Sequence, residues 1–397
     1  MTSRPVLRLR PKMDPRRIRR GFPWVYANET VLDRRSRAIP PGAIAQLEDG
    51  ERRPLATIAV NPNSKIVGRV LDRDPEAVID RAWLQRRLSD ALALREMLYD
   101  APFYRLIHAE ADGMPGTIVD RFGEVVVFQP NAAWIDVLAE EFAACLADLP
   151  GVTTVVKNAS GRARSLEGLD DVSAVVAGAV DGPTPVPMNG ATYMADIMGG
   201  QKTGLFYDQR PNHAFVARLA RGTEVLDVFS HVGGFALAAL AAGATRALAV
   251  DGSEPALDLA RQGAEATGVA DRFETRKSDA FAALEALATE GVTFGTVICD
   301  PPAFAPSKSA LDAGLRAYEK VARLATPLVE PGGTLTLCSC SHAASLDAFR
   351  TASLRGIARA GGKAQILRTG FAGPDHPMHP ALAESGYLKA ITVRLSP

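Results

Sequence analysis

The stretch that decides the fold is Val225-Leu226-Asp227-Val228-Phe229-Ser230-His231-Val232-Gly233-Gly234-Phe235. Its first five residues have the apolar pattern of a buried strand, and a helical pattern over Phe235–Ala242 follows the two glycines. Glycine lets a backbone approach a ligand closely, and the amides at a helix N-terminus face such a ligand. The stretch therefore predicts a strand, a tight turn and a helix that form one wall of a binding site.

From residue 188 to the end, strand patterns alternate with helical patterns. The other predicted strands are Ala247–Val250, Val297–Cys299 and Thr334–Leu337. The other predicted helices are Glu254–Thr267 and Leu311–Leu328. This alternation predicts an α/β fold, in which helices cover both faces of a parallel sheet. Ligands in that architecture bind beyond the carboxyl ends of the strands.

Acidic residues stand where a nucleoside would meet such a sheet. Asp251 ends the second strand, where a carboxylate can accept hydrogen bonds from both ribose hydroxyls, and Asp279 follows a third short strand, where it could meet an adenine. A dinucleotide site, or a turn without a ligand, would also fit Gly233-Gly234 alone. The sequence has no Gly-x-Gly-x-x-Gly motif, however, and Asp227 closes the first strand. These features favour S-adenosylmethionine over a nicotinamide.

The strand over Val297–Cys299 is followed by Asp300-Pro301-Pro302-Ala303-Phe304. Two prolines fix their φ angles, so they predict a rigid shelf that holds the acid and the neighbouring carbonyls against a planar base. Methyltransferases that act on nucleobases use such a shelf. A chance Asp-Pro-Pro turn is the alternative.

Cys340 follows the next strand, in Leu337-Cys338-Ser339-Cys340-Ser341-His342. Carbon 5 of cytosine becomes nucleophilic enough to take a methyl group once a thiolate has added at carbon 6. We therefore expect Cys340 to be the nucleophile.

The other thiols and the histidines give weaker evidence for a catalytic role. Cys145 and Cys299 are expected to be small core residues. Cys338 should point to the opposite side of the strand from its neighbour, so its role is ambiguous. His342 has a capping or solvent role. No zinc-ligand spacing is present, so no metal is expected.

The rest of the chain predicts two further domains. Short strands at Val6–Leu9, Ala43–Leu47, Thr57–Val60 and Ile66–Leu71 suit a small β-barrel over residues 1–76. Residues 77–187 combine a helix spanning Leu84 to Leu98 with a hairpin, Thr117–Asp120 and Glu124–Gln129, around Gly123. Gly182–Pro187 is expected to be a linker before the third domain, residues 188–397.

Composition and charge narrow the class of protein. Apolar residues make up 47% and charged residues 23% of the 397 residues, as in globular proteins. We expect no membrane span, and four cysteines without a regular framework favour the cytoplasm. The net charge is zero, but residues 4–20 carry eight basic side chains and one acid, Asp14. Such a patch binds phosphates or is simply a solvated face.

Several long motifs then occur in one order along nearly the whole chain. They are Arg20–Tyr26 (RGFPWVY), Asn61–Ser64, Glu110–Gly116 (EADGMPG), Asp120–Gly123, Leu166–Leu169, Gly199–Arg210 (GGQKTGLFYDQR) and Asp375–Pro380 (DHPMHP). In these motifs the chain resembles the bacterial large-subunit (23S) ribosomal RNA cytosine-5 methyltransferases with an N-terminal PUA domain.

That resemblance implies a PUA domain, a middle α+β domain and a Rossmann-like class I methyltransferase domain with a mixed seven-stranded sheet. It implies S-adenosylmethionine as cofactor and structured RNA, either 23S rRNA or a pre-ribosomal particle, as partner; a homodimer is allowed. The implied catalytic residues are Cys340 and Asp300. The implied cofactor-binding residues are Phe206, Gln209, Arg210, Phe229, Ser230, Gly233, Gly234, Asp251, Ser253, Asp279, Ala280 and Asp300. The implied substrate-binding residues are Arg16, Arg17, Arg20, Trp24, Lys202, Pro301, Pro302 and Phe304.

Two departures and three alternatives stay open. Ala303 stands where some cytosine-5 RNA methyltransferases have a second cysteine, and the loop reads Ser230-His231-Val232 where the family has a version that bears an aromatic residue. Methylation of an exocyclic amine or ring nitrogen of RNA would use the same shelf without a thiol. The remaining alternatives are a non-catalytic RNA-binding assembly factor and a small-molecule methyltransferase.

Overall fold

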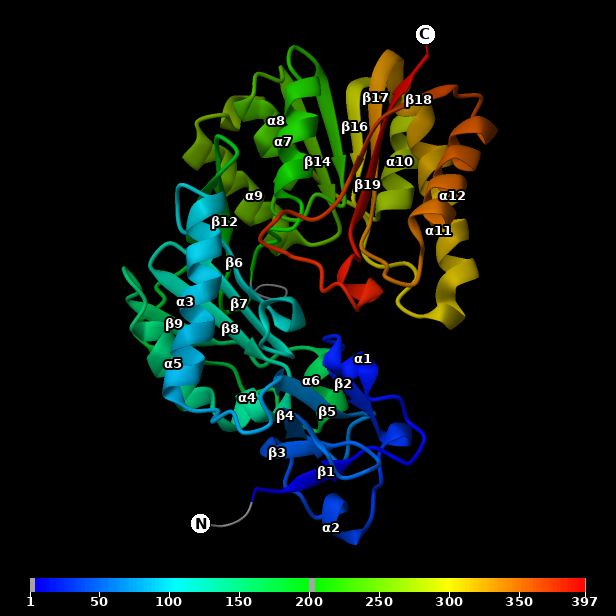
Figure 1. Cartoon of the computed structure of the whole chain (residues 1–397). Helices are drawn as coiled ribbons and strands as arrows, with labels where there is room; N and C mark the ends of the chain where they lie inside the picture. Colours follow the sequence, from blue (N-terminus) through cyan, green and yellow to red (C-terminus); the bar gives the residue numbers. More distant parts are fainter. Residues whose placement is uncertain (1–3, 200–203, 397) are drawn as a thin grey trace. The chain divides into compact units, whose positions relative to one another are not determined.

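The computed structural model describes residues 4–199 and 204–396, which fall into two compact units (Figure 1). The first unit comprises Met1–Gly182, Ile197–Gly204 and Asp375–Ala383, and the second comprises Pro183–Asp196, Leu205–Pro374 and Glu384–Pro397. None of the helices in the described part of the chain is long and apolar enough to cross a membrane. The division into three domains at residues 76 and 187 stays a prediction.

The N-terminal part of the first unit is a five-stranded sheet in the order β1-β3-β4-β5-β2. Its elements are β1 (Val6–Arg8), α1 (Arg16–Arg19), β2 (Trp24–Tyr26), η1 (Ala27–Glu29), α2 (Arg34–Arg37), β3 (Ala43–Glu48), β4 (Pro54–Val60) and β5 (Ile66–Asp72). The four predicted strands are confirmed. The sequence did not reveal β2, because three residues are too short to show an alternating pattern.

The middle part of the first unit is a second five-stranded sheet, ordered β10-β9-β8-β7-β6. Its elements are α3 (Arg81–Leu98), β6 (Phe103–His108), η2 (Ala109–Asp112), β7 (Thr117–Phe122), β8 (Val125–Pro130), α4 (Ala133–Val137), α5 (Ala139–Ala147), β9 (Thr154–Lys157), α6 (Arg162–Glu167) and β10 (Ala174–Ala177). The predicted helix and hairpin are confirmed. Trp83, Leu84 and Leu88 are buried on one face of α3, as its helical pattern predicts.

Buried charges join these two sheets into one unit. Arg69 of β5 forms ion pairs with Glu110 at 3.2 Å and with Glu167 at 3.0 Å. Glu167 also accepts a hydrogen bond from Asn61 at 2.9 Å. Because buried charges are stable only when they are paired, this cluster fixes how the barrel packs on the middle sheet.

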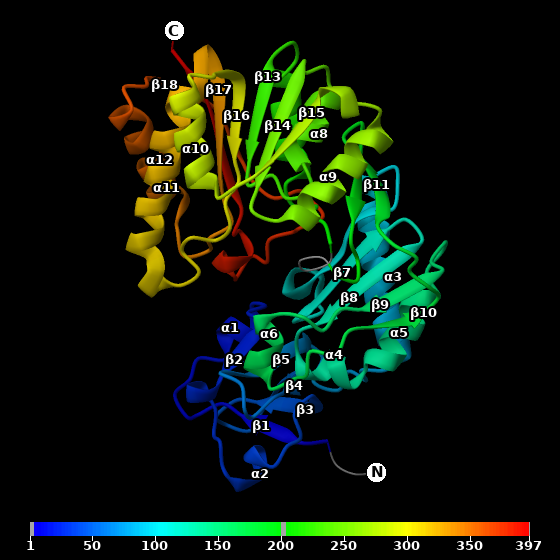
Figure 2. The ribbon, with the colours of Figure 1, turned by 180° about the vertical axis from the view of Figure 1, so that it is seen from behind.

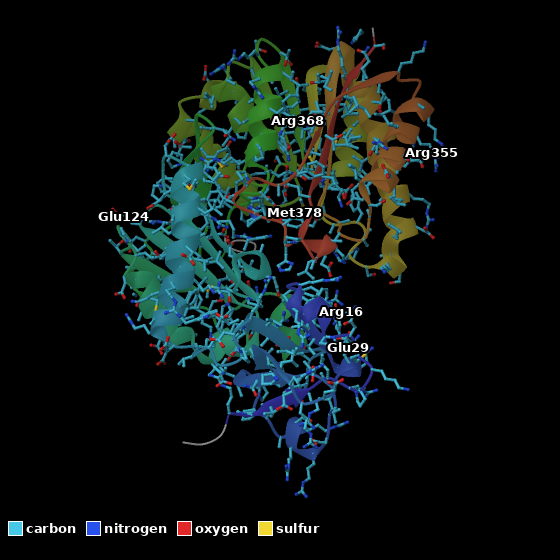
Figure 3. The ribbon with its side chains drawn as sticks, viewed as in Figure 1. Arg16, Glu29, Glu124, Arg355, Arg368 and Met378 are labelled. Atoms are coloured by element: carbon cyan, nitrogen blue, oxygen red, sulfur yellow. The ribbon has the colours of Figure 1, made fainter. Side chains whose placement is uncertain are left out.

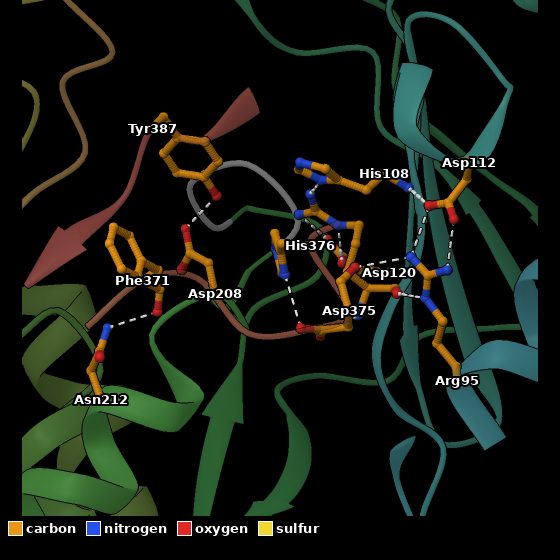
Figure 4. Close-up of polar contacts among 11 residues, drawn as sticks. Arg95, His108, Asp112, Asp120, Asp208, Asn212, Phe371, Asp375, His376 and Tyr387 are labelled. Atoms are coloured by element: carbon orange, nitrogen blue, oxygen red, sulfur yellow. Dashed lines mark hydrogen bonds and ion pairs between the residues drawn. The ribbon is translucent and has the colours of Figure 1, made fainter. Parts of the chain in front are cut away.

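The segment Asp375–Ala383 belongs to the first unit although it comes from the end of the chain. Arg95 of α3 pairs with both oxygens of Asp112, at 2.7 and 2.8 Å, and donates to the Asp375 carbonyl at 3.0 Å (Figure 4). The Asp375 carboxylate accepts from the Arg105 amide and contacts His376, both at 3.0 Å. These contacts explain why the motif over Asp375–Pro380 is rich in groups that form hydrogen bonds.

The prediction of a linker at Gly182–Pro187 is wrong. Residues Thr184–Met188 form strand β11, which pairs antiparallel with β12 (Ala191–Ala195). β11 pairs only with β12 in its two-stranded sheet, so Pro185 and Pro187 lie in an edge strand. Proline has no amide hydrogen to donate, and an edge strand tolerates that loss because one side of it pairs with no other strand. Val186 and Met188 alternate with these prolines and are buried.

The second unit contains a seven-stranded sheet in the order β15-β14-β13-β16-β17-β19-β18. Its strands are β13 (Glu224–Val228), β14 (Arg246–Asp251), β15 (Phe273–Lys277), β16 (Phe294–Cys299), β17 (Val329–Ser339), β18 (Ala364–Gly370) and β19 (Lys389–Leu395). Its helices are α7 (Arg210–Leu219), α8 (Gly234–Ala241), α9 (Glu254–Thr267), α10 (Ala280–Glu290), α11 (Leu311–Ala325) and α12 (Leu346–Arg359). β19 runs antiparallel to both its neighbours, so the sheet is mixed, as the resemblance implied.

Right-handed crossovers place these helices on both faces of the sheet (Figures 1 and 2). The chain moves outward from β13 to β14 and β15, and then returns to β16 on the other side of β13. The order of strands therefore reverses between β13 and β16. In open α/β sheets, ligands bind in the crevice beyond the carboxyl ends of the strands at such a point.

Candidate active site

The turn after β13 has an unusual backbone conformation. Phe229 and His231 have φ angles of 63° and 50°, in a region that side chains with a Cβ rarely adopt, and Gly233 has a φ of 79°. The Asp251 carboxylate fixes this turn, because its two oxygens accept from the amides of His231 and Ser253, each at 2.8 Å. Strained residues that are held by surrounding contacts are typical of ligand-binding turns.

Two buried polar atoms at this turn have no hydrogen-bond partner within the described chain. They are Oδ1 of Asp227, the penultimate residue of β13, and Oγ of Ser230. The other Asp227 oxygen accepts from the Ala236 amide at 3.0 Å. Buried polar groups are almost always paired, so these atoms fit a site that is completed by a polar ligand.

The predicted nucleoside residues lie at the carboxyl ends of β14 and β15. Asp251 ends β14, and Ser253 caps α9 by accepting from the Ala256 amide at 3.4 Å. Asp279 is exposed and caps α10, accepting from the Ala282 amide at 3.0 Å, and Ala280 is the first residue of that helix. These two helix N-termini therefore face the same sheet edge as the turn after β13.

Aromatic rings connect the cofactor turn with the Asp-Pro-Pro shelf. The Phe304 ring lies 6.3 Å from Phe229 and 6.2 Å from Phe281, and the second pair is stacked. Pro301 is buried, whereas Pro302 is exposed. Phe206 lies 5.1 Å from the His231 ring, on the other side of the turn. The structure thus brings the shelf and the cofactor turn together, as the order of strands requires.

Asp300 is held by a polar chain from α7 and the residues before it. The Gln209 side-chain amide donates to the Asp300 carboxylate at 2.9 Å, and the Asn212 side chain donates to Oε1 of Gln209 at 2.7 Å. Asn212 also donates to the Phe371 carbonyl at 3.2 Å, and Tyr387 donates to Asp208 at 2.6 Å (Figure 4). Arg210 begins α7. The motif that contains these residues therefore positions the shelf; its Lys202 lies outside the described residues.

Cys340 follows β17 directly and is half-buried. Ser341 Oγ accepts from the Ala305 amide, just after the shelf, at 3.0 Å and hydrogen-bonds to the Tyr318 hydroxyl at 2.8 Å. Tyr318 also accepts from Ser339 at 2.9 Å. Ser341 is thus tied directly to the residue after the shelf, and Ser339 is linked to Ser341 through one buried tyrosine. We call Ser339, Ser341, Tyr318 and Ala305 the hydroxyl bridge.

The three other cysteines are buried, which confirms the core role expected for Cys145 and Cys299. Burial raises the pKa of the Cys299 thiol, and burial together with the Asp300 charge raises the pKa of Cys338 well above its usual range. A thiol must ionise in order to attack, so Cys338 is a poor nucleophile. Cys340 is the one half-buried cysteine.

The basic cluster of the first unit divides into used and exposed side chains. Arg4, Arg8, Arg10 and Arg17 hydrogen-bond within the barrel, Arg17 to Glu29 and to the Trp24 carbonyl. Arg16 and Arg20 are exposed, and Figure 3 labels Arg16 on α1. Trp24 is half-buried, and its indole nitrogen donates to Glu110 at 2.8 Å. Lys12 and Arg19 are exposed as well, although Arg19 lies 3.8 Å from the Asp49 carboxylate. Arg16 and Arg20 are therefore among the side chains available for phosphate.

Comparisons with known proteins agree with this geometry. The S-adenosylmethionine-dependent methyltransferase family matches residues 170–368, and a PUA-like domain family matches residues 7–73. The chain is 36% identical to a ribosomal RNA large subunit methyltransferase of Deinococcus radiodurans, over 99% of this chain and 98% of the other. It is 34% identical to ribosomal RNA large subunit methyltransferase I of Shewanella amazonensis, over 98% and 99% of the two chains. The chain belongs to the ribosomal RNA large subunit methyltransferase family.

Solved structures share the fold of this methyltransferase. A putative SAM-dependent methyltransferase from Streptococcus mutans superposes with a TM-score of 0.82, at 19% identity over 98% of this chain and all of the other. A putative methyltransferase complexed with S-adenosylhomocysteine (SAH) superposes with a TM-score of 0.81 over 98% and 99% of the two chains, at 20% identity. The α/β fold and the use of S-adenosylmethionine are therefore shown for this methyltransferase.

Sequence reasoning missed two residues of this methyltransferase site. Tyr318 lies inside a helical pattern, where it looks like an ordinary core aromatic. Lys389 is buried in β19, with its ammonium against the segment that follows Cys340. The signal for Lys389 was present, because a lysine within the apolar run Leu388–Val393 is rarely buried without a partner.

Proposed function

We propose that this methyltransferase transfers a methyl group to carbon 5 of a cytosine in large-subunit ribosomal RNA, through a covalent adduct with Cys340. The observation that carries the proposal is the hydroxyl bridge, which ties the segment around a half-buried thiol to a base-binding shelf. Methylation at a nitrogen needs no thiol at this place.

Asp251, Asp227, Ser230 and the turn after β13 would hold S-adenosylmethionine, and Asp279 and Ala280 would meet its adenine. The bound cofactor supplies an electrophilic methyl group beside the shelf. Pro301 and Pro302 limit the motion of the shelf, so Asp300 and its neighbouring carbonyls can orient the cytosine ring. Phe304 contributes an apolar wall, since it packs on Phe229 and Phe281.

Cys340 then acts on the oriented base. Its thiolate forms a bond to carbon 6, which makes carbon 5 nucleophilic, and carbon 5 takes the methyl group while S-adenosylhomocysteine departs. Loss of the proton from carbon 5 lets the carbon–sulfur bond break, which returns the thiolate. With Ala303 in the position of a second cysteine, the chain provides no second thiol after the shelf, so we assign this proton to water.

The first unit is proposed to recruit the RNA. Arg16 and Arg20 would contact phosphates and Trp24 would stack on a base, a role that the PUA-like match over residues 7–73 supports. Ribosomal RNA as the substrate places this work in the cytoplasm. Deproteinised RNA and large ribosomal subunits, assayed side by side, show which form is the substrate.

The test is tritium transfer from labelled S-adenosylmethionine to unmodified large-subunit RNA, followed by digestion to nucleosides. Wild type should yield labelled 5-methylcytidine, and Cys340→Ala should lose at least about 10³-fold in rate, because the covalent step disappears. The matched control is Cys338→Ala, which removes the buried neighbouring thiol and should keep most of the activity. Labelled product of another kind, or full activity in Cys340→Ala, would move the assignment to nitrogen methylation.

A further inference from the structure

Lys389 is a buried ammonium that no carboxylate balances among the residues that the structure describes. Its side chain is 4% exposed, and within the described chain no Asp or Glu lies within ion-pair distance of it. Instead Nζ donates to two carbonyls, those of Ser341 and Ala344, each at 2.7 Å. Neutral carbonyls satisfy donors but do not offset the charge, and an uncompensated buried charge is costly. The site therefore favours an anion near this ammonium.

The strand register puts Lys389 opposite Ser339, the residue that precedes Cys340. β17 and β19 are antiparallel, and Lys389 lies directly opposite Ser339, so their side chains share one face of the sheet. The two carbonyls that Lys389 binds belong to the segment that begins with Cys340's own neighbour. Lys389 thus holds the nucleophile segment on the same side as the hydroxyl bridge.

Lys389 and Tyr318 both interact with the charge of Cys340. Burial lowers the pKa of Lys389 below its usual value, and the Cys340 thiolate offsets part of that shift. From α11, Tyr318 faces the same thiol, and its pKa is raised, first by burial and in smaller part by the Cys340 charge, so the phenol stays neutral near pH 7. His342 follows on the exposed side. Among these neighbours, the thiolate is the anion that can pair with the ammonium.

We propose that Lys389 is the positioning residue that stabilises the Cys340 thiolate and orients the segment carrying it. The role deepens the proposed function, since it concerns the same nucleophile. A buried ammonium in this position supplies a positive charge that favours the ionised form of the neighbouring thiol. The neighbouring Cys338 has the opposite environment, because the charge that faces it is Asp300.

The test measures the rate of Cys340 alkylation by iodoacetamide between pH 5 and 9, followed by mass spectrometry of the modified peptide. Cys340→Ala serves as the blank, since the other three thiols are buried. In wild type we expect the midpoint at least about one pH unit below the ordinary thiol value of roughly 8.5. Lys389→Met keeps the length of the stem but removes the charge, and should raise the midpoint by about one to two pH units. Lys389→Arg should hold it near the wild-type value.

The controls separate charge from structure. Lys363→Met removes an exposed lysine from the same unit and should leave the midpoint in place. A role for Lys389 confined to capping carbonyls would slow alkylation at every pH without moving the midpoint, and that result overturns the proposal. If Lys389→Met does not fold, the wild-type midpoint alone decides, because a value of about 8.5 or above refutes the proposal. Alkylation does not depend on methyl transfer, so it tests the role of Lys389 alone. Whether Cys340 is the catalytic nucleophile is tested separately by the tritium assay.

Discussion

The hydroxyl bridge predicts that Tyr318→Phe slows catalysis through a single buried oxygen. The Tyr318 hydroxyl accepts from Ser339 at 2.9 Å and hydrogen-bonds to Ser341 at 2.8 Å. Phenylalanine fills the same space but leaves the Ser339 hydroxyl without its acceptor. Tyr318 is 2% exposed, so water does not easily replace the lost oxygen.

The magnitude follows from these contacts. One orphaned buried hydroxyl and one lost hydrogen bond should reduce the free energy of unfolding by about 1–3 kcal/mol. Ser341 keeps its direct hydrogen bond to the Ala305 amide beside the shelf, but Ser339, on the other side of Cys340, loses its link to that contact. A displacement of about 1 Å between a nucleophile and its target costs about 10²-fold in rate, so we expect kcat to fall by roughly 10–100-fold, with KM for RNA little changed.

Two assays measure these effects, steady-state methyl transfer and denaturant unfolding. In a double-mutant cycle with Ser339→Ala, the two substitutions should couple by about 0.5–3 kcal/mol, because removing both partners leaves fewer unpaired groups than removing one. Tyr104→Phe is the matched control, since Tyr104 is also 2% exposed but lies on β6 of the first unit. Additive substitutions together with an unchanged kcat would refute the idea that the bridge positions Cys340.

Two further predictions concern charge. Burial raises the pKa of Asp227 to about 7, and the Asp251 charge adds to the rise. The folded state thus holds this proton more tightly than the unfolded chain, whose carboxyl titrates near 3.9, so the stabilisation is present below about pH 4 and is lost as pH rises to about 7. Asp227→Asn stays neutral, so its stability relative to wild type should grow by up to about 4 kcal/mol between pH 4 and pH 8 in cofactor-free protein, as measured by denaturant unfolding; a difference independent of pH would contradict the raised pKa. In the first unit, Arg16→Ala/Arg20→Ala should reduce the slope of log K against log salt for RNA binding by about 1.5–2, whereas Arg34→Ala/Arg35→Ala on α2 should leave it unchanged; equal slopes for the two pairs would remove Arg16 and Arg20 from the interface.

Local patterns in the sequence predicted most of the second unit. The turn at Ser230–Gly234, Asp251 and the Asp300–Phe304 shelf each follow an apolar strand, and in a parallel sheet the carboxyl ends of strands share one edge. That rule by itself places these residues close together. The sequence pattern predicted a linker at Thr184–Met188, where the structure has an edge strand that tolerates proline. It also missed β2, because three residues are too few to show an alternating pattern.

Only the tertiary structure decided the environment of each thiol. Cys338 and Cys340 are two residues apart, and nothing in their local sequence says which of them meets Asp300 and which meets Lys389. Lys389 lies 49 positions beyond Cys340 and reaches it because β19 inserts antiparallel between β17 and β18. The sequence therefore determined which strands bear chemical groups at their ends. The order of strands in space determined which of those groups become neighbours, and the ionisation of a thiol depends on its neighbours.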